Sequence, residues 1–188
     1  TPAVINNQPI STSGCIGYLI TIPLVASNAI SYQWKYFNGT NWVNVVDEAG
    51  VYSGAQTSSL TITGATVLNE LQYYCEVYST PTCLVVSNAV QLKVGDIWIG
   101  SSNDWNSDIN WCTGTKPTQS TDVIIATSRV GTNMPKISFS TTADCRNIEI
   151  QPGATITIES DLTHSGSLII NGSSSGTGTI TYNRYLEK

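Results

Sequence analysis

The residues best suited to chemistry gather in one stretch, Ile97 to Pro117, which holds three of the five tryptophans. Four oxygen-bearing side chains alternate there: Asp104, Asn106, Asp108 and Asn110. An EF-hand calcium loop counted from Asp104 needs Gly at its sixth position and Glu at its twelfth. The sequence has Ile109 and Thr115 at those places. We therefore expect a hydrogen-bonded turn here, with a looser calcium site as the alternative.

The tryptophans allow two interpretations. Flat aromatic rings that are exposed stack on sugars, so Trp105 with Trp111, or Trp42, is a candidate ligand-binding platform for carbohydrate. Structural roles are favoured instead. Trp98, Trp105 and Trp111 would cover the end of a stack of strands, and Trp42 would fill one face of a strand over residues 41–45.

The sequence shows no motif that indicates a catalytic site. A nucleophilic triad needs a histidine, an activated nucleophile and an orienting acid, yet His164 is the sole histidine and no GxSxG motif exists. No pair of carboxylates stands out, and the Gly-rich segment 172–178 lies between strands rather than before a helix. We expect no enzyme activity, no catalytic residue, no metal site and no cofactor.

Five cysteines in a sequence poor in lysine fit an oxidising compartment. No spacing matches a zinc site. Cys75 and Cys83 are symmetric about Ser79, so a hairpin turning near residues 79–81 would pair them in a disulfide. A Cys15–Cys75 bridge is the alternative, but Cys15 is out of phase with the alternating face that follows it. Because five is odd, at least one thiol is free or pairs elsewhere.

Composition limits the partners. Charged residues make up 11% of the 188 residues and the formal net charge is −5, which leaves no electrostatic footprint for nucleic acid. No apolar run is long enough to span a bilayer, so we expect no membrane insertion in this segment. Carbohydrate or surface proteins are the expected partners, and we expect a monomer.

The first half, residues 1–95, reads as short strands. Apolar and aromatic residues alternate in five runs: 18–24, 32–36, 60–62, 73–77 and 86–94. Turn residues separate these runs. Short alternating strands at this spacing predict a β-sandwich.

The order of motifs in this half resembles an immunoglobulin-like domain. The residues that carry the resemblance are Tyr32-Gln33-Trp34, Tyr52 to Ala55, Leu60 to Gly64, Tyr73-Tyr74-Cys75 and Ser87 to Val90. More narrowly, they are similar to the Ig-like repeats of large secreted Bacteroidetes-type surface proteins. The resemblance implies that Trp34 packs between two sheets and that Tyr73 is a tyrosine-corner residue.

The second half, residues 96–188, contains shorter β-branched strands separated by polar glycine turns. The expected strands are 122–125, 136–139, 147–150, 155–158, 167–170 and 178–182. Such strands are typical of a β-solenoid, in which each coil buries its apolar residues against the next. The irregular period keeps a second sandwich open as the alternative.

The entry into this half resembles secreted bacterial β-repeat modules. The matching residues are Trp98, Gly100, Asp104-Trp105, Asn110-Trp111, Gly114, Pro117 and Asp122 to Ile124. In such modules a cysteine after the second tryptophan motif accompanies a later one, which implies a Cys112–Cys145 disulfide. Residues 179–186 resemble the start of a further module, so this domain is expected to be truncated.

Together these observations predict an all-β protein, with an immunoglobulin-like β-sandwich over 1–95 followed by a solenoid-like or irregular β stack over 96–188. The expected function is a non-catalytic structural or adhesion segment of a secreted or cell-surface bacterial protein. The alternatives are a carbohydrate-binding module, or a fragment of a polysaccharide-degrading β-helix enzyme.

Overall fold

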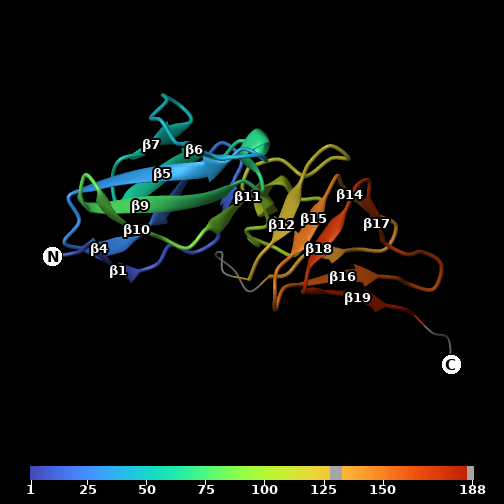
Figure 1. The fold of residues 1–188 in the computed structure, drawn as a ribbon. Helices are drawn as coiled ribbons and strands as arrows, with labels where there is room; N and C mark the ends of the chain where they lie inside the picture. The colour runs from blue at the N-terminus through green and yellow to red at the C-terminus, as the bar shows by residue number, and fades with distance from the viewer. Residues whose placement is uncertain (128–132, 186–188) are drawn as a thin grey trace. The chain divides into compact units, whose positions relative to one another are not determined.

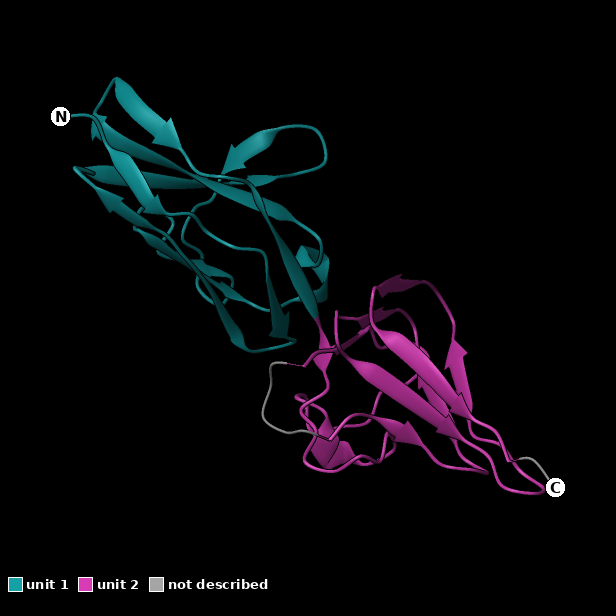
Figure 2. Ribbon diagram, turned by 90° about the horizontal axis from the view of Figure 1, so that it is seen from below, with its two compact units in different colours: residues 1–94 teal, residues 95–188 magenta. Residues whose placement is uncertain are grey.

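The computed structural model describes residues 1–127 and 133–185. The chain is built almost wholly of β-strands (Figure 1). It divides into two compact units, Thr1–Val94 and Gly95–Lys188 (Figure 2). The fold class is therefore all-β, as the alternating sequence predicts. The segment 94–96, between the predicted domains, lies inside strand β11 rather than in a loop.

Unit 1 is a sandwich of antiparallel strands. One layer contains β3 (Leu19–Pro23), β8 (Ser59–Thr63) and β7 (Tyr52–Ser53), with β1 (Val4–Asn7) paired to β4 (Val25–Ser27). The other contains β11 (Val90–Ile97), β10 (Cys83–Val86), β9 (Gln72–Thr80), β5 (Ser31–Phe37) and β6 (Trp42–Asn44), and β2 (Thr12–Cys15) pairs with β11. A single 3-10 turn, Thr66–Leu68, is the helical element described in this unit.

The core of unit 1 follows from period-two alternation, which places every second side chain on the inner face of its strand. Ile20 and Ile22 on β3 are buried, and so are Leu60 and Ile62 on β8. Trp34 on β5 is fully buried in the same core, and its indole N–H donates to Thr57 O at 2.9 Å. The position that the immunoglobulin resemblance implies for Trp34 is confirmed.

Two details depart from antibody-like domains. Strand β3 carries isoleucines where a disulfide partner for Cys75 would lie, so the core is closed by hydrophobic packing alone at this place. Tyr73 is buried, but its hydroxyl lies 3.0 Å from the Tyr52 hydroxyl. The predicted tyrosine corner, which would bond backbone upstream, is therefore replaced by a pair of tyrosines.

Unit 2 is a stack of parallel coils. Its strands are β12 (Val123–Ile125), β13 (Lys136–Ile137), β14 (Thr142–Cys145), β15 (Ile148–Ile150), β16 (Thr155–Glu159), β17 (Ser167–Ile170), β18 (Ser174–Gly176) and β19 (Thr179–Asn183). Three parallel ladders form: β12-β15-β18, β13-β16-β19 and β14-β17. Parallel pairing between successive coils identifies a β-solenoid and excludes the second sandwich.

The coils repeat at about 25 residues, since Val123 pairs with Ile148 and Ile148 with Ser174. Inward positions stack in register: Ile156 lies beside Ile180 and Ile158 beside Tyr182. The first two coils bury these rows. On β19 the same row is exposed: Ile180 and Tyr182 are 46% and 50% accessible to solvent. No described coil packs against this strand from the other side.

A polar ladder fixes one corner of the stack. Arg146 donates to both carboxylate oxygens of Asp122, at 2.7 and 2.5 Å, and Asn147 donates to the same carboxylate at 2.8 Å. The Asn147 side-chain oxygen then accepts from the Ser173 backbone N–H at 2.8 Å. Residues of three coils are thereby linked with the charges of Asp122 and Arg146 paired, which supports the same register as the apolar rows.

Two strands of unit 2 escape the sequence prediction. Strands β14 and β18 are polar apart from Ala143 and Cys145, so they carry no visible alternation. The last residue of the predicted further module, Leu186, lies outside the described residues. Among the described residues, no helix is long and apolar enough to cross a membrane.

Candidate functional site

The three tryptophans of the 97–117 stretch form what we call the tryptophan cap: Trp98, Trp105 and Trp111, each at most 1% exposed. Their rings meet edge to face, with centroids 5.2 Å apart for Trp98 and Trp111 and 4.8 Å apart for Trp105 and Trp111. They share one hydrophobic cluster with the inward residues of the first coils. A sugar platform must be exposed, so this burial leaves Trp105 and Trp111 no ring face for a ligand, and their packing agrees with the expected cap.

Hydrogen bonds hold the tryptophan cap in place. The Trp98 indole donates to Asn133 O at 2.7 Å and the Trp111 indole donates to Trp105 O at 2.8 Å. The Trp105 indole N–H is buried and has no hydrogen-bond partner among the described residues. Leaving a donor unpaired is costly, so the Trp105 side chain is held by ring packing while its backbone N–H donates to Lys136 O at 3.1 Å.

The alternating Asp and Asn residues build turns rather than gather around an ion. Asp104 accepts from the Asn106 backbone N–H at 3.0 Å, and Asp108 accepts from the Lys116 backbone N–H at 2.8 Å. Asn110 is buried and bonds Ser102 through both ends of its amide. These contacts agree with the expected hydrogen-bonded turn.

Neither predicted disulfide is formed in unit 1 or unit 2. Cys75, Cys83 and Cys145 are free thiols, whereas Cys15 and Cys112 are disulfide-bonded. For Cys75 and Cys83 the error lies in the turn. Strand β9 continues to Thr80, which pairs with Cys83, so Ser87 and not Cys83 lies opposite Cys75. Cys75 also points into the core while Cys83 is exposed.

The Cys112–Cys145 pairing, implied by the resemblance to β-repeat modules, is excluded by strand β12. Cys145 packs with Val123 and Ile125 on one face of this strand. Cys112 packs beside Ile124, which alternation places on the other face. The strand therefore separates the two sulfur atoms.

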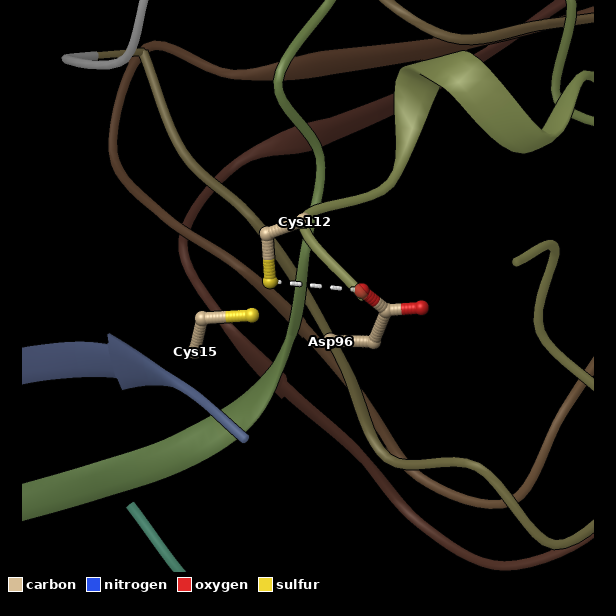
Figure 3. Close-up of side chains that lie close together, drawn as sticks. All are labelled: Cys15, Asp96 and Cys112. Carbon is tan, nitrogen blue, oxygen red and sulfur yellow. Dashed lines mark hydrogen bonds between the residues drawn. The ribbon is translucent and has the colours of Figure 1, made fainter. Parts of the chain in front are cut away.

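A buried carboxylate lies beside Cys112. Asp96 is 1% exposed and accepts from the Thr113 backbone N–H at 3.1 Å and from the Thr113 hydroxyl at 2.9 Å. Burial outweighs these hydrogen bonds and raises the pKa of Asp96 to about 6. The Cys112 sulfur lies 3.3 Å from Asp96 Oδ1, and the two side chains point toward each other (Figure 3). A disulfide sulfur has no proton to donate, so this contact does not stabilise the carboxylate as a thiol would.

Trp42, the remaining candidate for ligand binding, lies outside the core of unit 1. Its ring is half-buried and packs against Tyr74, with centroids 4.6 Å apart, and against Phe37, with centroids 5.4 Å apart. We call these three residues the aromatic patch. It lies on the solvent face of the layer formed by β6, β5 and β9. The expected alternation of Trp42 is correct, but the face it occupies is the outer one.

Next to the aromatic patch lies an ion pair. Lys35 Nζ and Glu76 Oε1 are 2.9 Å apart, and the Tyr78 hydroxyl donates to Glu76 Oε2 at 2.7 Å. Burial acts to raise the pKa of Glu76, but the hydrogen bonds from Tyr78 and Lys35 together outweigh it and lower that pKa. The hydrogen bond to Glu76 raises the pKa of Lys35. Both groups are therefore charged at neutral pH and neutralise each other.

The ion pair lies in the floor of a hollow of about 750 Å³, which we call the groove. We call the outer face of β5 and β9 its floor, and Asn44 of β6 and the loop 56–58 line it as well. Lys35, Asn44, Gln56, Glu76 and Tyr78 all line it. The groove combines an open volume with several polar side chains, which is the arrangement a ligand site requires.

Sequence reasoning missed the groove because its residues come from three separate strands and a loop. One signal was present. Polar residues alternate with core residues on both central strands, with Gln33 and Lys35 between Tyr32, Trp34 and Tyr36, and Glu76 between Cys75 and Val77. These alternate positions mark the outer face, although the sequence does not show which strands adjoin.

The exposed histidine forms no catalytic arrangement with the described residues. Its backbone N–H donates to Asp161 Oδ1 at 2.7 Å, and its ring nitrogen Nδ1 lies 2.6 Å from the Thr163 hydroxyl. Asp161 also accepts from the Thr163 backbone N–H. This network closes the tight turn at 161–164 and aligns no nucleophile with His164.

Comparison with known proteins gives a domain of unknown function (DUF8693), whose family model matches residues 97–186. No curated protein matches the chain. Solved structures are similar to about half of it, and two of them serve as examples. The D1 domain of Duf (Kirre) has 17% identity and a TM-score of 0.39, covering 49% of this chain and 95% of that one.

The second is the titin M10–obscurin-like 1 Ig complex, with 15% identity and a TM-score of 0.36 over 50% of this chain and 93% of that one. At these scores the description of unit 1 as immunoglobulin-like rests on its own strand order and on buried Trp34.

Proposed function

We propose that this chain is a non-catalytic structural and adhesion segment of a secreted or cell-surface protein. The β-solenoid of unit 2 supplies a rigid support, and the sandwich of unit 1 supplies an exposed surface for contact. The observation that carries the proposal is the tryptophan cap. The most chemically suggestive residues of the sequence close the end of a coil stack and are not exposed to a ligand.

Two further observations support it. Hydrogen-bonded ladders and parallel strands leave few flexible segments for a protease to enter, because cleavage requires local unfolding. The disulfide-bonded state of Cys15 and Cys112 agrees with an oxidising, extracellular compartment. A bacterial origin is part of the proposal and follows from the resemblance to Bacteroidetes-type repeats.

The carbohydrate-binding alternative keeps only Trp42 of its three tryptophans, and the β-helix enzyme alternative finds no row of acids in the described coils. The test is to incubate the oxidised chain with a panel of polysaccharides and measure release of reducing ends, beside limited digestion with thermolysin. We expect no turnover and a chain that stays intact for hours. Release of reducing ends, or rapid cleavage within the described strands, would contradict the proposal.

A further inference from the structure

We propose that the groove of unit 1 binds a neutral carbohydrate chain. This inference rests on the proposed adhesion role and gives that role a ligand class and a place. It concerns residues on β5, β6, β9 and the loop 56–58, not the tryptophans that the sequence singles out.

The charge of the groove excludes strongly charged ligands. Of the described residues that line it, Lys35 and Glu76 alone are charged, and they form an ion pair 2.9 Å long. Their side chains are 22% and 14% exposed, so the pair is accessible from the groove but well fixed. A polyanion needs uncompensated cations, which this floor does not offer.

The backbone beside the floor offers little room for a peptide that binds as an added strand, because strand addition needs an unpaired sheet edge. Strand β5 pairs with β9 over Ser31–Tyr36 but with β6 only over Lys35–Phe37, and β6 is the last strand of its sheet. The open edges are therefore residues 31–33 of β5 and the three residues of β6, each shorter than a typical strand of about five to six residues. Recognition here falls mainly to side chains.

Those side chains suit hydroxyl groups. The Lys35 ammonium has three N–H donors, of which the ion pair with Glu76 uses one. Asn44 on β6 and Gln56 in the loop 56–58 are exposed and line the groove, and the described contacts include no hydrogen bond to either side chain. Each amide donates and accepts, as each sugar hydroxyl does, so both side chains can bond a sugar chain in the groove.

The groove also offers apolar surface for the C–H faces of a sugar ring. Tyr78 is held in place by its hydrogen bond to Glu76, and Ile30 is 66% exposed at the same end. Fixed aromatic and aliphatic groups beside mixed hydrogen-bonding groups are what a polyhydroxylated, uncharged ligand requires.

The experiment uses the full oxidised chain and isothermal titration calorimetry with five neutral hexasaccharides: cellohexaose, laminarihexaose, mannohexaose, xylohexaose and chitohexaose. A heparin hexasaccharide is the charged comparison. The test variant is Asn44→Ala with Gln56→Ala. The matched control is Asn41→Ala, an exposed asparagine three residues from Asn44 that does not line the groove. Trp42→Ala tests the aromatic patch separately.

We expect saturable binding of at least one neutral hexasaccharide, weakened about tenfold or more in the double variant and changed by less than about twofold in Asn41→Ala. Both altered side chains are exposed, so the melting temperature should stay near that of the parent chain. In the parent chain, a two-dimensional NMR titration with the sugar should change the amide chemical shifts of β5, β9 and the loop 56–58.

The proposal is overturned if no neutral hexasaccharide binds, if heparin alone binds, or if binding survives the double variant and is lost in Trp42→Ala. The proposed structural function would still hold in each case if the chain releases no reducing ends from polysaccharides and resists thermolysin. The failure of the groove is thus distinct from the failure of the proposed function.

Discussion

The tryptophan cap of unit 2 and the aromatic patch of unit 1 are built from similar residues and lie in opposite surroundings. Each holds three aromatic rings in edge-to-face or tilted contact, at centroid distances between 4.6 and 5.4 Å. The rings of the cap are at most 1% exposed, whereas those of the patch are only half-buried. Ring contacts alone therefore do not distinguish a core from a surface.

The difference lies in what covers the rings. The tryptophan cap shares its cluster with inward residues of two coils, such as Ile125 and Ile156, so chain lies on every side of it. The aromatic patch lies on a sheet whose other face already packs against β3 and β8. Aromatic residues in a sequence thus indicate a binding site only where the fold leaves one ring face uncovered.

The largest expected effect tests this difference directly. Trp105→Ala should lower the free energy of unfolding by about 3–5 kcal/mol, because it empties a large volume in the core. Trp42→Ala should cost about 1 kcal/mol, since its ring is half in water. Calorimetric unfolding of both variants measures this.

Trp105→Phe is the control, because it keeps a ring but removes the indole N–H that has no described partner. It should cost less than Trp105→Ala. Equal losses for Trp105→Ala and Trp42→Ala would break the comparison.

The buried carboxylate of Asp96 in unit 2 and the ion-paired carboxylate of Glu76 in unit 1 should respond differently to pH. The pKa of Asp96 is raised by burial to about 6 from 3.8, so between these values the folded state holds a proton that the unfolded state releases. Stability should therefore fall as pH rises from about 4 to above 6, by up to roughly 3 kcal/mol. Asp96→Asn keeps the shape and removes the charge. It should flatten this slope and be more stable than the parent chain at pH 7, as measured by urea unfolding at several pH values.

The carboxylate of Glu76 in the groove should give the opposite pH dependence of stability. Hydrogen bonds from Tyr78 and Lys35 outweigh burial and lower the pKa of Glu76, so its contribution is present above its unfolded pKa of about 4.5 and is lost as pH falls through the folded value. Glu76→Gln should cost about 1 kcal/mol at pH 7 and much less at pH 3. The same urea series measures it. A greater stability of Glu76→Gln at pH 7 would show that this ion pair is not favourable.

The smallest effect concerns the thiols of the two cores. Burial raises the pKa of Cys75 in unit 1 and of Cys145 in unit 2 to about 12, and the thiolate is the reactive form. At pH 8 the native, unreduced chain should react rapidly with a thiol reagent at exposed Cys83 only. In denaturant it should react at three positions. A single reactive thiol in denaturant would instead fit the disulfides predicted from sequence.

The fold was largely predictable from sequence and the groove was not. Alternation located the central strands of unit 1 and most strands of unit 2, because burial on one face leaves a period of two. It did not locate the short strands β1, β2, β4 and β7. It failed for β14 and β18, which join the stack by parallel pairing, with Ala143 and Cys145 of β14 as their only buried apolar side chains among the described residues. The Cys75–Cys83 prediction failed for a related reason. A shift of the turn by two residues leaves the alternation intact but gives Cys75 a different partner.

The regular register of unit 2 makes its length adjustable in whole steps. Each coil uses about 25 residues and adds the spacing of one strand, about 4.8 Å, along the stack. An inserted segment of one coil would keep every inward row in line, whereas an odd offset within a strand would turn the apolar rows outward. The hydrogen bonds from Asp122 through Asn147 to Ser173 require the same number of residues in each coil. Duplication of one coil, by evolution or by design, can therefore lengthen unit 2 by one fixed increment.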